Sequence, residues 1–435
     1  MQWRNIKGGM LTSYNKNMST QKPNGIINLD GIMRYRQTGA WNFPLVTSDP
    51  VTGSIWAIGG DDRVFNGVGM YRTYSTSNSP PVYKSSPAQV GAVTTWSSVA
   101  AGLHHSLAIK NDNTLWSWGR NTFGATALGG NSGGPGSYAR NTYQPAQLGM
   151  LTNWSKISAG YHTSAAIKTD GTLWVWGLNL YGELGLGNKI NYSSPKQVGL
   201  LTNWRDVYPG TRRMFAIKTD GTLWTWGNNT GGSLGLGNTT NYSSPKQIGS
   251  RTDWKQIVNV GAKSVFGLTT DGSLWFWGQD MSGVSFYSGT QVSFTSPILI
   301  SNEKWLKLGS SQVGSSSYAN NILGIKNDGS LWIWGTNSSA LVGYAFYGGP
   351  PAITSPILVD SSKNWFDAAV INYGLGNAAV AAIKTDGTLW TWGRNLDGQL
   401  GLNNTTGYSL PKQVGSSTNW RRISGSRRHF LAIRS

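Results

Sequence analysis

The sequence contains no cysteine, which excludes disulfide bonds and thiolate metal sites. Charged residues make up only 12% of the chain, against roughly 25% in an average globular protein. No apolar run reaches the length of about 18 residues that a membrane span needs, and residues 1–20 lack the apolar segment of a secretory signal. The composition therefore predicts a polar, weakly charged surface and no membrane span. Such surfaces are commoner on extracellular and particle-surface proteins.

Acidic residues are scarce. There are 18 of them against 36 lysines and arginines, which gives a net charge of +18. An excess of this sign favours an anionic partner, such as an acidic protein, an anionic polysaccharide or a nucleic acid, and it also keeps a protein soluble. We favour nucleic acid least of these.

A twelve-residue unit recurs along the chain. It reads AIKTDGTLWTWG at Ala216–Gly227 and at Ala382–Gly393, and AIKTDGTLWVWG at Ala166–Gly177. Looser or shortened copies end at Gly59, Gly119, Gly278 and Gly335. The seven closing glycines are 60, 58, 50, 51, 57 and 58 residues apart, which is the spacing of a repeat architecture.

The unit has the chemistry of a β-hairpin. Asp220-Gly221 is a turn pair that tolerates positive φ, and the residues on either side alternate as strands do. Trp224 and Trp226 are two residues apart, so they should lie on one face of the return strand. Gly227 then allows a sharp turn or a close approach to a neighbour. We interpret the tryptophans as packing residues, because large aromatic side chains are usually buried.

Each unit carries two further marks. One is a proline expected to open a short apolar strand, at Pro87, Pro145, Pro195, Pro245, Pro297, Pro356 and Pro411. The other is an anchor tryptophan eight or nine residues later, at Trp96, Trp154, Trp204, Trp254, Trp305, Trp365 and Trp420. About four strands per unit favour propeller blades over a solenoid.

The two ends of the repeat region complete one another. The first unit has a return strand near residues 54–58, but the part before it matches the anchor-tryptophan segment of the other units poorly. The last unit has this segment, at Trp420–Ile433, and no return strand after it. We therefore predict an all-β, seven-bladed β-propeller over residues 41–435, closed by pairing of its N- and C-terminal strands. Eight blades are the alternative, since residues 45–47 could mimic a further strand. Residues 1–40 are predicted to form a separate basic N-terminal arm.

The repeats resemble those of the regulator of chromosome condensation family. The match rests on the D-G-x-L-W-x-W-G strand, on GLNLYGELGLG at Gly177–Gly187 and on GNNTGGSLGLG at Gly227–Gly237, and it extends over roughly residues 45–435. The resemblance implies a seven-bladed propeller. It also implies that the chain could act like the founding members, which promote nucleotide exchange on a small GTPase and dock on nucleosomes. No long hairpin insertion of the exchange-factor type occurs here.

The family's blade histidine is kept at His105 and His429 and is shifted by one position at His162. We expect these histidines to hydrogen-bond to backbone between strands. No nucleophile with a base, no carboxylate pair in a cleft and no metal-binding pattern is evident, so we predict no catalysis, no cofactor and no metal.

Basic positions are the better candidates for a site. Lys110, Lys168, Lys218, Lys326, Lys384 and Arg434 share one strand position and should form a ring, where the turn aspartates could neutralise them. The pairs that break the repeat, Arg212-Arg213 and Arg421-Arg422 with Arg427-Arg428, are better candidates for an anionic contact.

Long loops supply aromatic candidates. The loops Gly60–Pro87 and Arg120–Pro145 should stand together, and recognition residues often lie on such loops. Irregular loops that follow an anchor tryptophan, such as Ser310–Asn321, are expected on a different rim. The aromatic candidates for partner binding are Tyr71, Tyr74, Tyr83 and Tyr138.

The arm supplies the remaining candidates, Arg4, Lys7, Lys16, Lys22, Arg34 and Arg36. We expect it to become ordered on a protein partner or an assembly. The sequence thus favours a non-enzymatic binding or structural module, in particular a surface or virion protein used in adhesion and anchored by this arm. A virion or extracellular location is favoured over the cytoplasm. An exchange factor or chromatin-type binder, and a carbohydrate-binding propeller, are the alternatives.

Overall fold

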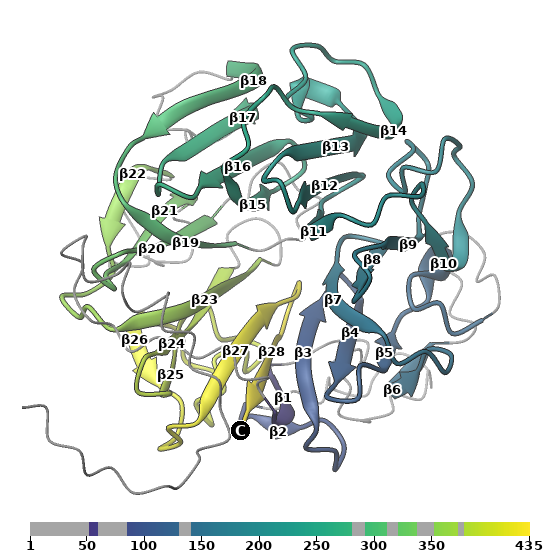
Figure 1. Cartoon of the computed structure of the whole chain (residues 1–435). Coiled ribbons are helices and arrows are strands. Elements are labelled where there is room, and N and C mark those ends of the chain that lie inside the picture. Colours follow the sequence, from purple (N-terminus) through teal and green to yellow (C-terminus); the bar gives the residue numbers. More distant parts are fainter. Residues whose placement is uncertain are drawn as a thin grey trace, which may run out of the picture. The chain divides into compact units, whose positions relative to one another are not determined.

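A computed structural model describes residues 52–59, 85–129, 141–280, 292–310, 321–336, 352–372 and 378–435. All of them belong to the second of the two units into which the chain divides, Met1–Thr47 and Ser48–Ser435. This second unit contains seven four-stranded antiparallel sheets arranged as blades around a centre (Figure 1). The predicted all-β, seven-bladed propeller is confirmed. The predicted arm, residues 1–40, lies outside the described residues.

We number six blades in chain order and call the seventh the closure blade. Blade 1 contains β3 (Trp96–Ala101), β4 (His105–Lys110), β5 (Leu115–Gly119) and β6 (Thr142–Gln147); blade 2 contains β7 (Trp154–Ala159), β8 (Thr163–Lys168), β9 (Leu173–Gly177) and β10 (Tyr192–Gln197); blade 3 contains β11 (Trp204–Pro209), β12 (Arg213–Lys218), β13 (Leu223–Gly227) and β14 (Tyr242–Gln247). Blade 4 contains β15 (Trp254–Val260), β16 (Ser264–Thr269), β17 (Leu274–Asp280) and β18 (Val292–Ser301); blade 5 contains β19 (Trp305–Ser310), β20 (Asn321–Lys326), β21 (Leu331–Thr336) and β22 (Ala352–Leu358); blade 6 contains β23 (Trp365–Asn372), β24 (Ala378–Lys384), β25 (Leu389–Gly393) and β26 (Tyr408–Gln413). The closure blade contains β27 (Trp420–Gly425), β28 (Phe430–Arg434), β1 (Ser54–Ile58) and β2 (Ala88–Gln89).

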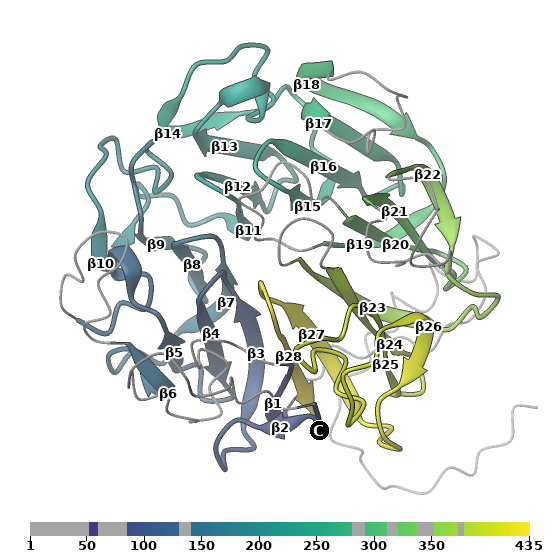
Figure 2. The same ribbon diagram turned by 180° about the vertical axis from the view of Figure 1, so that it is seen from behind.

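In every blade the strand that begins with the anchor tryptophan lies nearest the centre of the ring. The strand that contains the repeated proline, or in the closure blade follows it, lies outermost. The two opposite views agree on this arrangement (Figures 1 and 2). Described helices are limited to two short 3-10 turns, η1 (Thr122–Gly124) and η2 (Thr230–Gly232), and no helix in the described residues is long and apolar enough to cross a membrane.

The repeated unit forms the predicted hairpin. Gly221 in its turn has φ +80°, and a Cβ there would lie 1.8 Å from the Thr252 carbonyl oxygen. The closing Gly227 has φ +103°, and a Cβ there would lie 2.6 Å from the Arg212 carbonyl oxygen. Both positions therefore require glycine, one for a turn and one for close approach. Trp224 and Trp226 both pack edge-on against Trp204, as expected of residues on one face.

The outer prolines do not open their strands in most blades. β10 and β14 begin at Tyr192 and Tyr242, three residues before Pro195 and Pro245. In β10 the pairing shifts register between Tyr192 and Lys196, so the proline lies at a bulge of the edge strand. A bulge on an outer strand tolerates a residue without an N–H. Among the described outer strands, only β2 begins directly after its proline, Pro87.

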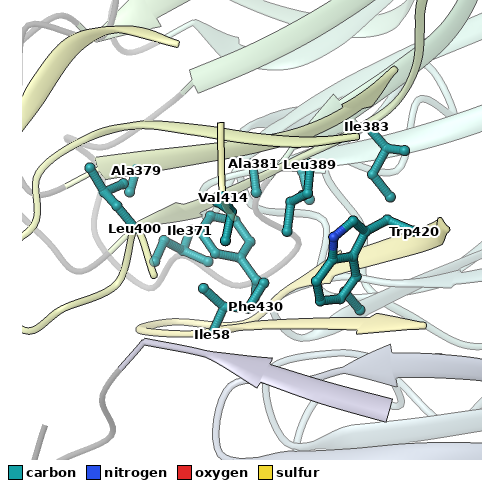
Figure 3. Packing of buried hydrophobic residues seen from close by; sticks show 12 residues of the cluster. Ile58, Ile371, Ala379, Ala381, Ile383, Leu389, Leu400, Val414, Trp420 and Phe430 are labelled. Carbon is teal, nitrogen blue, oxygen red and sulfur yellow. The ribbon is translucent and has the colours of Figure 1, made fainter. Parts of the chain in front are cut away.

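The predicted closure is confirmed residue by residue. β1 pairs antiparallel with β28 from Ser54 opposite Arg434 to Ile58 opposite Phe430. Figure 3 shows Ile58, Phe430 and Trp420 packed against blade 6 in one apolar cluster. Strands from the two ends of the repeat region thus share one sheet, which leaves no open edge at that point of the ring.

Candidate partner-binding rim

The hairpin order of each blade gives the ring two different rims. The turn rim carries the Asp-Gly turns between the second and third strands, together with the anchor tryptophans. The opposite rim, which we call the loop rim, carries the connection between the first and second strands and the loop that leaves the third strand. In blade 1, His105 lies opposite Gly119 in the strand pairing, so these two connections are neighbours. The expectation that they belong to different rims was wrong, because an antiparallel strand returns every second connection to the same side.

The turn rim is organised by the repeated aspartates. Asp220 accepts hydrogen bonds from the Thr222 N–H (2.9 Å) and hydroxyl (2.7 Å), and that hydroxyl accepts one from Trp224 Nε1 at 3.0 Å. Blades 1, 2 and 6 repeat this pattern at Asp112, Asp170 and Asp386. The hydrogen bonds from Thr222 hold the pKa of Asp220 below its usual value, and Lys218 adds to the effect. These acids therefore serve the fold.

The predicted ring of cations is present, but it is held by aromatic faces. The charged group of each member lies over a tryptophan, from 3.6 Å for Lys110 over Trp116 to 5.1 Å for Arg434 over Trp56. The other members are Lys168, Lys218, Lys326 and Lys384. Blade 4 has Thr269 at this position, and Arg251 covers Trp275 there instead, at 4.6 Å. Cation–π contacts at partly buried sites stabilise the blades, so this ring is structural.

The loop rim, in contrast to the turn rim, carries mainly basic side chains. Basic side chains are placed there by almost every blade whose loops are described: Arg120, Lys189, Arg212, Lys263, Arg394, Arg427 and Arg428. Among the described residues, its acidic side chains are Glu183, Asp280 and Asp397, and the first two are buried at 0% and 1% exposure. Arg120 is buried, but the other six basic side chains keep contact with solvent and outnumber Asp397, the one described acid of this rim that is not buried. This excess of basic side chains suits an anionic partner.

Arg212 and Arg213, adjacent in sequence, have separate roles. Arg212 is exposed, and its guanidinium lies over Tyr181 at 5.2 Å. Arg213 is 1% exposed and donates to Asn259 Oδ1 (3.0 Å), the Ser264 carbonyl (3.0 Å) and the Ala262 carbonyl. The prediction that Arg213 contacts a partner was wrong, because these bonds occupy its guanidinium in joining blade 3 to blade 4. Burial lowers its pKa to about 9.

The four arginines near the C-terminus do not form one patch. Arg421 and Arg422 begin β27 beside Trp420 and are exposed toward the turn rim, whereas Arg427 and Arg428 follow the end of that strand on the loop rim. Arg427 and Arg428 line a narrow recess with Leu103 and His104, between the closure blade and blade 1. Both pairs stay candidates for an anionic contact, but the strand that separates them places them at different rims.

The histidines also differ from expectation. His105 is 2% exposed, and its Nε2 lies 2.8 Å from Ser164 Oγ of blade 2, which in turn donates to the Ala125 carbonyl at 2.7 Å. Its direct partner is thus a side chain of the next blade and not backbone. Burial lowers the pKa of His105 and of His429 to about 4. The one-residue shift at His162 places it in the loop, half exposed, while Thr163 takes the buried position.

Some predicted site residues lie outside the described part of the chain. These are Arg4, Lys7, Lys16, Lys22, Arg34, Arg36, Tyr71, Tyr74, Tyr83 and Tyr138. Within the described part, no three His, Asp or Glu side chains gather where they could hold a metal ion. Sequence reasoning missed Phe123, Tyr161 and Tyr181, which lie on the loop rim beside His162 and Arg212.

Glu183 gives the loop rim a pH dependence. Its side chain is buried and accepts a hydrogen bond from the Tyr181 N–H at 2.6 Å, and burial raises its pKa to about 7. In blade 6, Gln399 takes the same place and accepts from the Asp397 N–H at 2.8 Å. The glutamate is therefore protonated in the folded protein between its ordinary pKa near 4.5 and about 7, and its contribution to stability falls as the pH rises through this window.

We expect Glu183→Gln to stabilise the protein at pH 8 by on the order of 2 kcal/mol and to change it little at pH 5, because only at the higher pH is a buried charge removed. Denaturant unfolding at both pH values measures this. Glu303→Gln, at a carboxylate that is 54% exposed, is the control and should shift stability by less than about 0.5 kcal/mol at either pH. An equal effect of Glu183→Gln at pH 5 and pH 8 would contradict the assignment.

The ring of four-stranded blades, closed by strands from both ends of the repeat region, defines a seven-bladed β-propeller with one basic rim. Models of the regulator of chromosome condensation (RCC1) repeat match residues 170–217, 220–268 and 386–433, and a second model of that repeat matches residues 96–125 and 154–183. The chain therefore contains RCC1 repeats in the stretches that these models match.

The similarity to individual proteins is modest. The chain is 24% identical to the regulator of chromosome condensation of Xenopus laevis over 137 residues, 31% of each chain. It is 32% identical to the ultraviolet-B receptor UVR8 of Arabidopsis thaliana over 91 residues, 21% of this chain and 19% of the receptor. The match thus spans less than a third of either relative. The solved structure of Prp20p from Saccharomyces cerevisiae superimposes with a TM-score of 0.69 at 17% identity, covering 88% of this chain and 92% of that one, which supports the fold.

Proposed function

We propose that this propeller is a non-catalytic binding module whose loop rim docks on an acidic surface of a protein partner. The observation that carries the proposal is the separation of charge between the two rims. The described aspartates of the turn rim are largely engaged in hydrogen bonds within their own turns, as at Asp220, whereas the loop rim exposes arginines and lysines with Asp397 as the one acid there, among the described residues, that is not buried. A protein that meets this rim with carboxylates gains electrostatic complementarity and faster association.

A protein is favoured over the other anionic candidates by the comparison with solved structures. Yeast Prp20p, which shares this fold, has binding properties toward Gsp1p and histones, both of them proteins. The alternative of an exchange factor or chromatin-type binder rests on this relative and on the family name alone. A surface, virion or adhesion role anchored by residues 1–40, and a polysaccharide ligand, stay predictions whose residues lie outside the described part of the chain.

The rim is tested by reversing charge at two matched places. Arg427→Glu with Arg428→Glu changes the loop rim, and Arg421→Glu with Arg422→Glu makes the same net change at the turn rim of the same blade. We expect the first pair to weaken binding of a long polyglutamate at least 10-fold at 150 mM salt, and the second at most about 2-fold, because a rim charge acts mainly where the partner lies. Calorimetric titration measures both affinities, and thermal melting checks folding.

Equal weakening by the two pairs would show that the polymer responds to net charge and not to one rim. That result would overturn the proposal.

A further inference from the structure

One part of the loop rim combines aromatic side chains with basic ones. Blades 1 to 3 are neighbours in the ring (Figure 1). Their loops carry contacts among aromatic, histidine and arginine side chains on this rim. We call this the aromatic–basic patch, and it consists of His104, Phe123, Tyr161, His162, Tyr181 and Arg212.

His162 is at the centre of the patch. Its ring lies 4.4 Å from that of Tyr161 and 5.5 Å from that of Phe123, both edge-on, and 6.3 Å from that of His104. All four side chains are half-buried, so each keeps one part of its surface in contact with solvent. Burial lowers the pKa of His162 to about 3, and electrostatic repulsion from His105, Arg120 and Arg212 adds to this. The imidazole is therefore a neutral group in a cationic setting.

Arg212 supplies the exposed charge of the patch. Its Nη1 donates to the Tyr181 hydroxyl at 3.2 Å while the guanidinium covers the ring, so both side chains are held in place. The one acidic residue among the described loop-rim residues of blades 1 to 3 is Glu183, and it is fully buried. A pre-oriented arginine on a tyrosine, without an exposed carboxylate beside it in this described region, has the composition of an interface hot spot.

Two residues of the patch have a positive φ angle. Arg212 has φ +65° and Phe123 has φ +57°, in the left-handed region that favours glycine. Gly231, at the position in blade 3 that corresponds to Phe123, has φ +69°. A large side chain thus stands where the backbone would prefer glycine. Strain of this kind persists where the surroundings fix it, and it is concentrated at functional sites.

The aromatic residues of the patch are also departures from the repeat. The fourth residue after the closing glycine is aromatic in blades 1 and 2, at Phe123 and Tyr181, but is Gly231 in blade 3 and Asp397 in blade 6. Tyr161 likewise corresponds to Leu103 and Thr211 in the neighbouring blades. Packing of the blades does not require these aromatic residues, because blades 3 and 6 form the same four-stranded sheets without them.

We propose that the aromatic–basic patch is the principal recognition site of the loop rim and that it binds an acidic peptide segment of a protein partner. The inference rests on the proposed function and specifies where on the rim the partner is held. Carboxylates of the segment would pair with Arg212 and accept from the imidazoles of His104 and His162, while its apolar or aromatic side chains pack on Phe123, Tyr161 and Tyr181. A single-stranded nucleic acid would instead need a continuous cationic groove along its backbone.

The test uses the full chain and an eight-residue glutamate peptide with one central tyrosine. We expect Arg212→Ala to weaken its binding at least 10-fold and Tyr181→Ala about 5-fold, with unchanged melting temperatures. Arg427→Ala with Arg428→Ala, elsewhere on the same rim, should weaken it less than about 3-fold, and Arg421→Ala on the turn rim not measurably.

The outcomes separate the two proposals. Equal losses of peptide affinity for Arg212→Ala and for Arg427→Ala with Arg428→Ala would contradict the patch as the principal site. They would still agree with binding by the basic loop rim. Failure of the wild-type chain to bind either this peptide or the long polyglutamate at low salt would overturn both. Tighter binding of an eight-nucleotide oligothymidine, with the same sensitivity to Arg212→Ala and Tyr181→Ala, would make the patch a nucleic-acid site and overturn the peptide assignment.

Discussion

Deleting residues 420–435 should convert a cooperatively melting ring into an aggregating chain. The deletion removes β27 and β28, leaving β1 paired only with the two-residue strand β2. It also removes Phe430, Leu431 and Ile433, each 0% exposed, which pack on both neighbouring blades. At about 2–3 kcal/mol for each large apolar side chain, the loss is comparable to the total stability of an ordinary domain. Calorimetry and light scattering measure the two effects.

Addition of the missing strands provides the control for this deletion. A peptide of residues 420–435 supplied in trans should restore part of the melting transition, because β28 pairs with β1 through five residues in register. A peptide with the same residues in scrambled order should not. Unchanged melting and solubility of the deleted chain, without any peptide, would show that closure between β1 and β28 is not needed for the fold.

Much of the fold was predictable because the same sequence features recur in each blade. The Asp-Gly turn, the paired tryptophans and the closing glycine each have a local physical reason, and they recur with a spacing that fixes the number of blades. The closure was predictable because the two incomplete units are complementary in sequence, and the pairing of Ser54–Ile58 with Phe430–Arg434 confirms it. The strand starts before Pro195 and Pro245 were not predictable, because a bulge depends on the register of the neighbouring strand.

The site was less predictable, because sequence proximity does not fix the direction of a side chain. Arg212 and Arg213 are adjacent, yet one is exposed at positive φ and the other is buried against Asn259. A change of one residue at His162 moves an imidazole from a buried position to the rim. The aromatic residues at Phe123 and Tyr181 did leave a signal, since the repeat has Gly231 and Asp397 at that position. Only the structure shows that Phe123 packs against His162 and that Tyr181 lies under Arg212.

The inner and outer tryptophans of one strand should differ sharply in their importance. Trp226 is 0% exposed, packs against Trp204 at 6.1 Å between ring centroids and donates to the Glu183 carbonyl of blade 2 at 2.9 Å. Trp226→Ala should lower the free energy of unfolding by about 3–5 kcal/mol, because it leaves a large cavity and an unpaired carbonyl at the boundary of two blades. Denaturant unfolding of the full chain measures this.

Trp224→Ala is the matched comparison for this change, on the same strand and the same face. Trp224 is only partly buried, bonds within its own blade to Thr222 at 3.0 Å and carries the Lys218 ammonium over its ring at 3.7 Å. Its loss removes half-buried area and one cation–π contact, so a cost of about 1–2 kcal/mol is expected. Because the two substitutions remove the same atoms, the difference between them measures the contribution of contacts between blades. Equal losses of unfolding free energy for the two substitutions would show that contacts between blades stabilise the ring no more than contacts within a blade. That result would contradict the role inferred for Trp226.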